Sequence, residues 1–320
     1  PAPYNFHNMK QLFVTLTLIL VGVCLYAQIN LDITWQNCYG GSNFDEDGNI
    51  VETDFGYFLL SETRSDDGQI TRYWGEGDIW LAAVDSIGNF LWGRCYGGTS
   101  VEISGNIIKD NFGFYYFSGW TFSNDGDVQS GNHGNYDRWI VKIDINGRII
   151  WEKCYGGTGR DYGPTLKMLS NGQIIAYSAT TSSDGDVPVN YGYLDVWITI
   201  IDPENGDILT NKVFGNIGQN NIFDIVETKD GGFFFTSEAQ EVEGMVQGSF
   251  HGNCDVWAVK LDSNFNIEWQ KLYGGSSIDY QGWSLLELED GYIFLAQTIS
   301  DDGEVTGFHG IAGDEGTEDI

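Results

Sequence analysis

The stretch Trp151-Glu152-Lys153-Cys154-Tyr155-Gly156-Gly157 decides the fold, because the chain repeats it with small changes. A Trp-x-x-(Cys/Leu)-Tyr-Gly-Gly phrase begins at Trp35, Trp92, Trp151 and Trp269, and a worn copy fits a register that starts at Thr210. The spacings are 57, 59, 59 and 59 residues. A fixed period of this length predicts stacked supersecondary units, none of which can bury its apolar face alone.

One repeat contains four strand-like segments. Residues 103–108 and 113–120 are apolar and aromatic, are joined by a tight turn, and are followed by a loop of about 16 residues. Residues 137–144 and 149–155 form a second such pair. Four short antiparallel strands repeated radially predict an all-β chain, a β-propeller of four-stranded blades with five visible repeats, the last truncated. A β-solenoid and tandem small sandwiches are the alternatives.

The two ends predict export and truncation. Residues 9–27 have the charged, apolar and small-residue regions of a signal peptide, so residues 1–8 are interpreted as upstream sequence that is not native. An extracellular, cell-surface or periplasmic location follows, with no transmembrane segment after signal removal. The propeller is predicted over 28–320, with repeats at 35–91, 92–150, 151–209, 210–268 and 269–320.

The charge of the chain excludes one class of partner. Asp plus Glu number 46 against 15 Lys plus Arg, and the formal net charge is -31. Such a chain repels phosphate backbones, so nucleic acid is not an expected partner, whereas cations are.

Eight of the eleven tryptophans occupy two repeat positions, which predicts packing between blades. Four lie on the fourth strand and four on the third: Trp35, Trp92, Trp151 and Trp269, then Trp80, Trp139, Trp197 and Trp257. The off-pattern Trp74, Trp120 and Trp283 are better candidates for an exposed contact.

A carboxylate or amide follows each repeat start by ten residues. The five are Asp45, Glu102, Asp161, Asn220 and Asp279. They could ring the mouth of a central channel and collect a cation. The alternative is that each accepts backbone N–H groups of the Gly-Gly turn, as Asp and Asn commonly do.

Acidic loops between the second and third strands are candidate metal ligands. The residues are Asp66, Asp67, Asp125, Asp127, Asp184, Asp186, Asp301 and Asp302. Carboxylates around a Gly resemble part of a calcium loop, and Ca²⁺ is the one cofactor that we consider. The full EF-hand spacing is missing, so simple Asx turns remain the alternative.

An aromatic-Gly-x-x-Asp pattern precedes each third strand. Its aromatic residues, Trp74, His133, Tyr191 and His251, are candidates for a ligand-binding face. Because Trp and Tyr replace His here, ligation of a metal by histidine is poorly supported. The Asp of the pattern is expected to cap the start of the strand.

The repeats resemble those of bacterial secreted β-propeller proteins, which are built around Tyr-Gly-Gly and Ser-x-Asp-Gly-Asp-Val, as at 155–157 and 183–187. The resemblance covers essentially all of residues 33–320 and implies a fold and a compartment. A weaker likeness is to the tryptophan-docking repeats of pyrroloquinoline-quinone enzymes, through Asp85-x-x-Gly88-x-x-x-Trp92 and Asp144-x-x-Gly147-x-x-x-Trp151. Thr210 and Phe265 depart from that pattern, and it transfers no cofactor residues.

The sequence favours a secreted or cell-surface module that is not an enzyme and that binds a surface protein or a glycan, with calcium stabilisation left open. The alternative is an exported hydrolase of polysaccharide that uses two channel-mouth carboxylates. An enzyme should break the repeat symmetry with unique polar residues in one cleft. The copy that starts at Thr210 is the exception to the symmetry. Either its sequence has drifted, or its differences mark a break in the ring that a ligand uses.

Overall fold

The computed structural model describes residues 32–46 and 48–309. Residues 1–8 and the predicted signal peptide at 9–27 lie outside the described residues. The chain divides into two units, residues 1–38 and 39–320. Within the first unit, residues 32–38 are described and carry no regular structure. The eighteen strands of the described residues all lie in the second unit.

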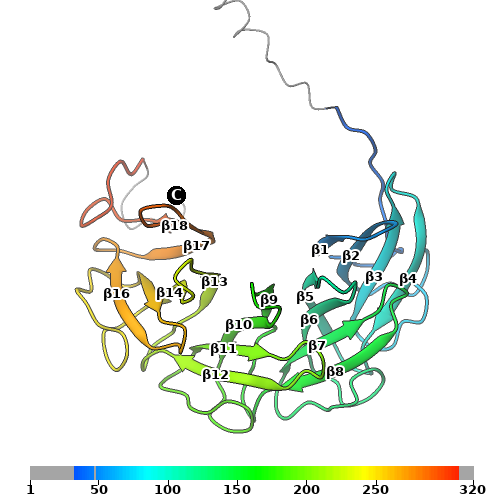
Figure 1. The fold of residues 1–320 in the computed structure, drawn as a ribbon, viewed down its shortest axis with the longest axis horizontal. Coiled ribbons are helices and arrows are strands. Elements are labelled where there is room, and N and C mark those ends of the chain that lie inside the picture. Colours follow the sequence, from blue (N-terminus) through cyan, green and yellow to red (C-terminus); the bar gives the residue numbers. More distant parts are fainter. Residues whose placement is uncertain (1–31, 47, 310–320) are drawn as a thin grey trace, which may run out of the picture. The chain divides into compact units, whose positions relative to one another are not determined.

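Four sheets of four antiparallel strands follow one another along the chain, and a two-stranded sheet follows them (Figure 1). Sheet one holds β1 (Asn49–Glu52), β2 (Gly56–Thr63), β3 (Asp78–Asp85) and β4 (Phe90–Tyr96). Sheet two holds β5 (Glu102–Lys109), β6 (Tyr115–Thr121), β7 (Asp137–Ile143) and β8 (Ile149–Tyr155). Sheet three holds β9 (Thr165–Met168), β10 (Ile174–Thr180), β11 (Asp195–Ile201) and β12 (Ile208–Phe214). Sheet four holds β13 (Ile222–Glu227), β14 (Phe233–Ala239), β15 (Asp255–Leu261) and β16 (Ile267–Tyr273), and the last sheet holds β17 (Asp279–Glu287) and β18 (Tyr292–Thr298).

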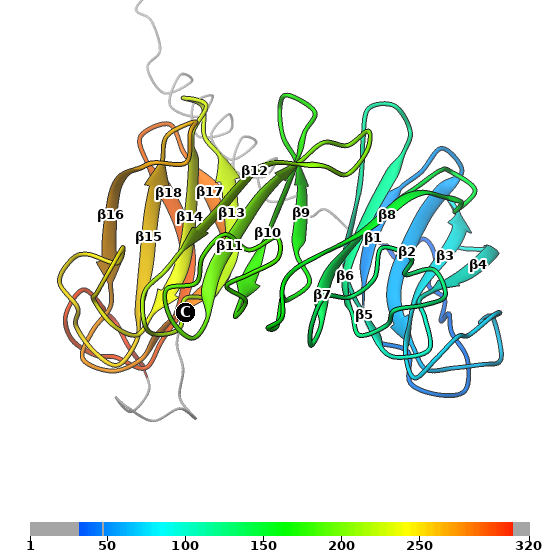
Figure 2. The same ribbon diagram turned by 90° about the horizontal axis from the view of Figure 1, so that it is seen from below.

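These sheets are the blades of a β-propeller, as the sequence predicts. Each four-stranded sheet pairs its strands in chain order, the up-and-down arrangement of a blade. The first strand of one sheet contacts the first or second strand of the neighbouring sheet: β1 contacts β5, β5 contacts β9, β10 contacts β13 and β13 contacts β17. Figure 2 shows the sheets side by side in the same order. None of the described residues belongs to a helix long and apolar enough to cross a membrane.

The sequence repeat and the sheet are offset from each other. The phrases that begin at Trp92, Trp151 and Trp269 each supply the fourth strand of one sheet and then the link to the next sheet, as β8 does before Gly156, whereas the phrase at Trp35 lies outside any strand. The first strand of the following sheet begins only after that link. A repeat cut at the Trp therefore contributes to two neighbouring sheets, which couples them covalently.

Tryptophans of the third strands fill the space between sheets. Trp139, Trp197 and Trp257 are fully buried, and Trp80 is nearly so. Each indole N–H of the first three donates to the side chain one residue after the repeat start on the fourth strand, at Glu152, Asn211 and Gln270 respectively. In sheet one this position is Gly93, and the Trp80 indole nitrogen is buried without a partner among the described residues.

The fourth-strand tryptophans pack less completely than the sequence predicts. Trp92 and Trp151 reach the glycine turns of the next sheet's outer hairpin, at Gly147 and Gly206. These glycines adopt φ values of 70° and 76°, which an L side chain rarely tolerates. Trp269 remains 41% exposed, because it faces the two-stranded sheet and contacts Phe234 and Tyr292 instead.

In three copies, the tyrosine hydroxyl of the repeated phrase bonds to the outer hairpin turn of the sheet that follows it. The hydroxyls of Tyr39, Tyr96 and Tyr155 donate to the carbonyl oxygens of Gly88, Gly147 and Gly206, at 2.6, 2.7 and 2.6 Å. The tyrosine of the repeated phrase is therefore a contact between sheets. Where the phrase has Phe214 this hydrogen bond cannot form.

We predict that Trp139→Ala destabilises the propeller by about 3–5 kcal/mol, because it removes a fully buried aromatic side chain and leaves a cavity. Urea unfolding followed by circular dichroism measures this change in the free energy of unfolding. Phe112→Ala is the control, since Phe112 is 86% exposed and its loss should change stability by less than about 0.5 kcal/mol. Equal effects of the two substitutions would contradict the packing role.

Candidate functional site

The five acceptors that follow the Gly-Gly links hold the links in place. Asp45, Glu102, Asp161, Asn220 and Asp279 each accept the backbone N–H of the second link residue, at 2.7–2.8 Å. All but Asp45 are buried. We call each acceptor with its bound link N–H a link clasp. These five side chains therefore point into the links. They form the hydrogen bonds of the alternative in which each accepts a backbone N–H group of the turn.

A hydroxyl group completes four of the link clasps. Thr63, Thr121, Thr180 and Thr298, at the ends of the second strands, donate to the acceptor oxygens of Asp45, Glu102, Asp161 and Asp279. In the fourth copy Ala239 replaces the threonine, and Asn220 donates to the backbone oxygen of Glu238 instead. The exchange of acid for amide is therefore matched by the loss of the hydroxyl donor.

The acidic loops close over the same links. Asp67, Asp125, Asp184 and Asp302 accept the backbone N–H of the residue after Gly-Gly, at 2.6–2.8 Å. These hydrogen bonds lower the pKa of Asp67, Asp184 and Asp302. In the described residues, no three His, Cys, Asp or Glu side chains come together as a group that could hold a metal ion. Calcium binding by these loops, including Asp66, Asp127, Asp186 and Asp301, stays a prediction.

The aromatic residues of the aromatic-Gly-x-x-Asp pattern are exposed or partly exposed. Trp74 and Tyr191 are each 37% exposed. The ring nitrogens Nδ1 of His133 and His251 lie 2.6 and 2.9 Å from the carboxylates of Asp137 and Asp255. The guanidinium of Arg72 lies over the Trp74 ring at 5.0 Å. Each aromatic residue belongs to a different sheet junction, and no contact joins one of them to another among the described residues.

The aspartates of that pattern bury one oxygen each without a partner. Asp78, Asp137, Asp195 and Asp255 use Oδ2 to accept the backbone N–H four residues before them, as predicted for a strand cap. Their Oδ1 atoms are buried and unpartnered within the described residues. Burial raises the pKa of Asp78 to about 7 and that of Asp195 to about 6, and it raises those of Asp137 and Asp255 as well.

The repeat symmetry breaks at one position near the end of the second strands. The residue before the last one in these strands is Glu62, Trp120, Ala179, Glu238 or Gln297. The Trp120 side chain there reaches the link of the next sheet, where its ring meets the Tyr162 ring at 5.5 Å between centroids. Ala179 is too short to fill the same space beside the link at Asn221. A hollow therefore opens between sheets three and four.

This hollow, which we call the inner hollow, has a volume of about 340 Å³. Its walls combine aromatic rings with hydroxyl and amide groups. The lining residues are Trp120, Tyr162, Gly163, Thr165, Tyr177, Ser178, Ala179, Leu194, Asn221, Ile222 and Phe223. Aromatic faces beside a few polar groups are suited to a ligand that has both apolar C–H faces and hydroxyl groups.

A buried arginine supports the floor of the inner hollow. Arg138 stands opposite Trp120 in the β6–β7 pairing, where the other sheets have Ile79, Val196 and Val256. Its Nε donates to Ser178 Oγ at 2.8 Å, and its Nη2 donates to the backbone oxygen of Trp197 at 2.6 Å. Burial lowers the pKa of Arg138, while the charge of Asp161 opposes this. Arg138 thereby fixes the orientation of the Ser178 hydroxyl.

Two residues with carboxyl groups, Glu238 and Asp224, do not line the inner hollow but form hydrogen bonds with residues that do. The backbone N–H of Glu238 donates to the oxygen of Asn221, and burial raises the pKa of the Glu238 carboxyl to about 7. Asp224 accepts the Tyr177 hydroxyl at 3.2 Å and forms an ion pair with Lys167. Sheet four therefore carries one carboxyl group with a raised pKa, Glu238, and one carboxylate in an ion pair, Asp224.

Sequence reasoning named Trp120 as a candidate for contact but missed Tyr162, Ala179, Asn221 and Glu238. The site forms because the side chain of Ala179 is short, so no sequence motif marks it. The signal in the sequence was the variable position shared by Ala179 and Glu238, which alignment of the copies on the link acceptors would have revealed.

Comparison with known proteins found no matching protein-family profile and no curated protein of similar sequence. Among solved structures, the chain is similar to a thermostable family-43 glycoside hydrolase, with a TM-score of 0.38 and 13% identity over 80% of this chain and 84% of that one. It is also similar to a xylan β-1,4-xylosidase from Bacillus halodurans (0.37, 12%), covering 77% of this chain and 47% of that one. A third is a mannose phosphorylase from Leishmania mexicana (0.34, 10%), with 78% and 84% covered.

This finding contradicts the expectation that the chain is not an enzyme, because the three structures are all of enzymes. The likeness concerns the fold. What this chain itself does must be argued from its own residues.

We predict that Asp161→Ala destabilises the chain by about 3 kcal/mol or more. The substitution leaves three buried donors unpaired: the Gly157 N–H and the hydroxyls of Thr180 and Ser182. Asp161→Asn should cost clearly less, because an amide oxygen accepts the same link N–H at Asn220. Urea unfolding of both variants measures the difference, and a similar cost for Asn and Ala would contradict the link clasp.

We predict that the protein becomes less stable as the pH rises from 5 to 7. The pKa values of Asp78, Asp195 and Glu238 are raised to about 7, 6 and 7 in the fold, whereas in the unfolded chain they return to about 4. The folded state therefore holds protons that the unfolded state has released, and stability falls with pH until the folded carboxyls ionise. Each group contributes at most about 1.4 kcal/mol per pH unit. Urea unfolding at several pH values should show this slope reduced in Asp195→Asn, and a slope unchanged in that variant would contradict the assignment.

Proposed function

We propose that this propeller is a carbohydrate-acting hydrolase that binds a glycan chain in the inner hollow. The observation that carries the proposal is the hollow itself, where Ala179 breaks the symmetry of the repeats beside Trp120 and Tyr162. The C–H face of a sugar ring packs against an aromatic face, and its hydroxyl groups form hydrogen bonds with a polar group such as Asn221. Polysaccharide outside the cell is the substrate class that agrees with the expected export.

In this proposal Glu238 is the proton donor and Asp224 is the second carboxylate. Hydrolysis of a glycosidic bond needs one carboxylic acid to protonate the leaving oxygen and one carboxylate to activate water or to attack the sugar. A pKa of about 7 keeps much of the Glu238 carboxyl protonated at neutral pH. The ion pair of Asp224 with Lys167 and its hydrogen bond from Tyr177 support the complementary role for Asp224 in this proposal. Two carboxyl groups in different electrostatic surroundings are what this division of roles requires.

We predict that Glu238→Gln lowers the rate of polysaccharide cleavage at least 100-fold while leaving binding within about threefold, because it removes the proton and keeps the shape. Release of reducing ends from soluble xylan, mannan and glucan measures cleavage, and calorimetric titration with the corresponding hexasaccharides measures binding. Ala179→Trp should abolish binding by filling the hollow.

Phe112→Ala, on an exposed loop, is the matched control for both assays. Full cleavage by Glu238→Gln would refute the proton donor. Unchanged binding by a folded Ala179→Trp variant would refute the hollow as the site. Binding of the glycans without any cleavage by the wild-type chain would refute the hydrolase.

A further inference from the structure

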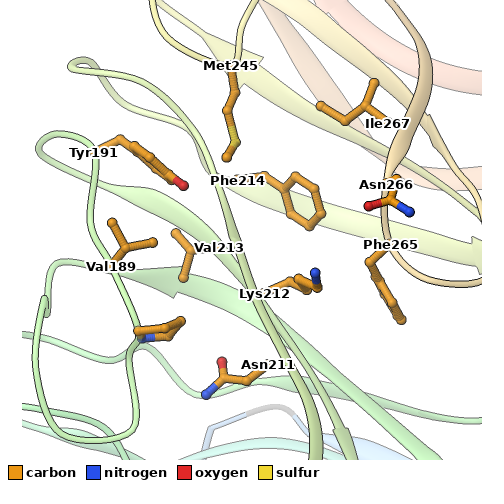
Figure 3. Close-up of a pocket in the computed structure, with 11 residues that line it drawn as sticks. Val189, Tyr191, Asn211, Lys212, Val213, Phe214, Met245, Phe265, Asn266 and Ile267 are labelled. Carbon is orange, nitrogen blue, oxygen red and sulfur yellow. The ribbon is translucent and has the colours of Figure 1, made fainter.

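A second cavity lies on the outer side of the junction between sheets three and four (Figure 3). It has a volume of about 420 Å³, and we call it the outer groove. Apolar side chains dominate its walls, including Val189, Met245 and Phe265. Lys212 lies between Asn211 and the turn that carries Phe265, as Figure 3 shows. None of its lining residues belongs to the inner hollow.

The junction between sheets two and three has the equivalent cavity, of about 410 Å³, which we call the polar groove. Lys153 occupies the position of Lys212 and forms an ion pair with Asp207 at 2.6 Å. Glu152 accepts hydrogen bonds from Ser130 and from the Trp139 indole. Asp186 also lines this groove. The lysine of the polar groove thus shares its surroundings with three carboxylates.

The outer groove retains the lysine and loses all three carboxylates. Asn211 stands at the position of Glu152, Met245 at that of Asp186 and Asn266 at that of Asp207. Lys212 forms no ion pair in the described part of the chain. The charge of Lys212 does reach Asp262, but that carboxylate is already engaged by Asn264 and Asn266. In a chain of net charge -31, this groove is a local exception.

The outer groove also has apolar side chains where the polar groove has polar ones. Val189 and Phe214 replace Ser130 and Tyr155, so the tyrosine bond between sheets is absent at this junction. Phe265 replaces the turn glycine Gly206 and keeps its left-handed backbone, at φ 62°. A bulky residue is rarely found there, and strained residues of this kind cluster at ligand sites. Phe265 is held by stacking on Phe233, at 4.5 Å between ring centroids.

We propose that the outer groove binds a small amphipathic carboxylate, with its carboxylate on Lys212 and its apolar tail against Val189, Met245 and Phe265. Charge complementarity selects the anion, because the ammonium of Lys212 is the charge among the groove's lining residues and no carboxylate competes for it. The apolar walls select the tail, since burying it removes apolar surface from water. The polar groove cannot bind such a ligand, because Asp207 already pairs with Lys153 and two more carboxylates repel the anion.

Octanoate is the probe, and isothermal titration calorimetry at low ionic strength is the measurement. One molar equivalent should bind, and 1-octanol and acetate should bind at least tenfold more weakly, because each lacks one half of the recognition. Asn266→Asp restores the acid of the polar groove and should weaken octanoate at least tenfold. Met245→Asp is a second variant with the same expected result, and thermal melts confirm that each variant is folded.

Two matched controls complete the experiment. Lys212→Met should weaken the affinity for octanoate at least tenfold, whereas Lys153→Met in the polar groove should leave that affinity unchanged. Polysaccharide cleavage should be the same in all of these variants, so this proposal stands or falls apart from the proposed hydrolase. Absent binding, equal affinity for octanoate and 1-octanol, or unchanged affinity in both folded acid variants would overturn it.

Discussion

A buried oxygen that accepts the backbone N–H of each Gly-Gly link is the interaction on which the other contacts depend. The link must pass from the outer strand of one sheet to the inner strand of the next, and its N–H groups are then removed from water. Asp161 and its counterparts satisfy one of these groups, and the acidic loops satisfy the next, as Asp184 does. Only with the links held in this way can the third-strand tryptophans and the tyrosine bonds bring neighbouring sheets into contact. The negative charge of the chain is therefore partly a consequence of how its links are made.

The same constraint explains where the chain is free to vary. The fourth copy differs from the others at two residues of the link clasp together, with Asn220 in place of the acid and Ala239 in place of the hydroxyl donor. Positions beside the link clasp are less restricted. At the junction of sheets three and four a short Ala179 opens the inner hollow, and Asn211, Met245 and Asn266 replace the three acids of the polar groove in the outer groove. Both cavities lie where the repeat is least regular, so the divergence of the copy at 210–268 coincides with the two proposed ligand sites.

The fold could be predicted from the sequence because its signals are repeated. Trp151 to Gly157, the strands around residues 99–157 and the turn glycines recur in register, and each copy supports the interpretation of the others. The site could not be predicted in the same way. Its defining residue, Ala179, acts by leaving space, and its partners Trp120, Tyr162 and Asn221 come from three copies. The repeated acids, such as Asp161, were the clearest sequence signal for a site, but they hold the links. The partial exposure of Trp269 also escaped prediction, since it depends on which sheet stands next to it.

Hydrogen–deuterium exchange of the folded protein in the presence of oligosaccharide tests the central claim most directly. Glu238→Gln protein would be mixed with hexasaccharides of xylose, mannose and glucose, so that bound chains are not cleaved. Slower exchange is predicted at residues 162–165, 177–179 and 221–223, which line the inner hollow, and unchanged exchange at 103–106, which match 162–165 in the preceding copy and do not line it. Protection spread evenly over the links of all copies, or absent from the inner hollow, would contradict a site created by the break in symmetry.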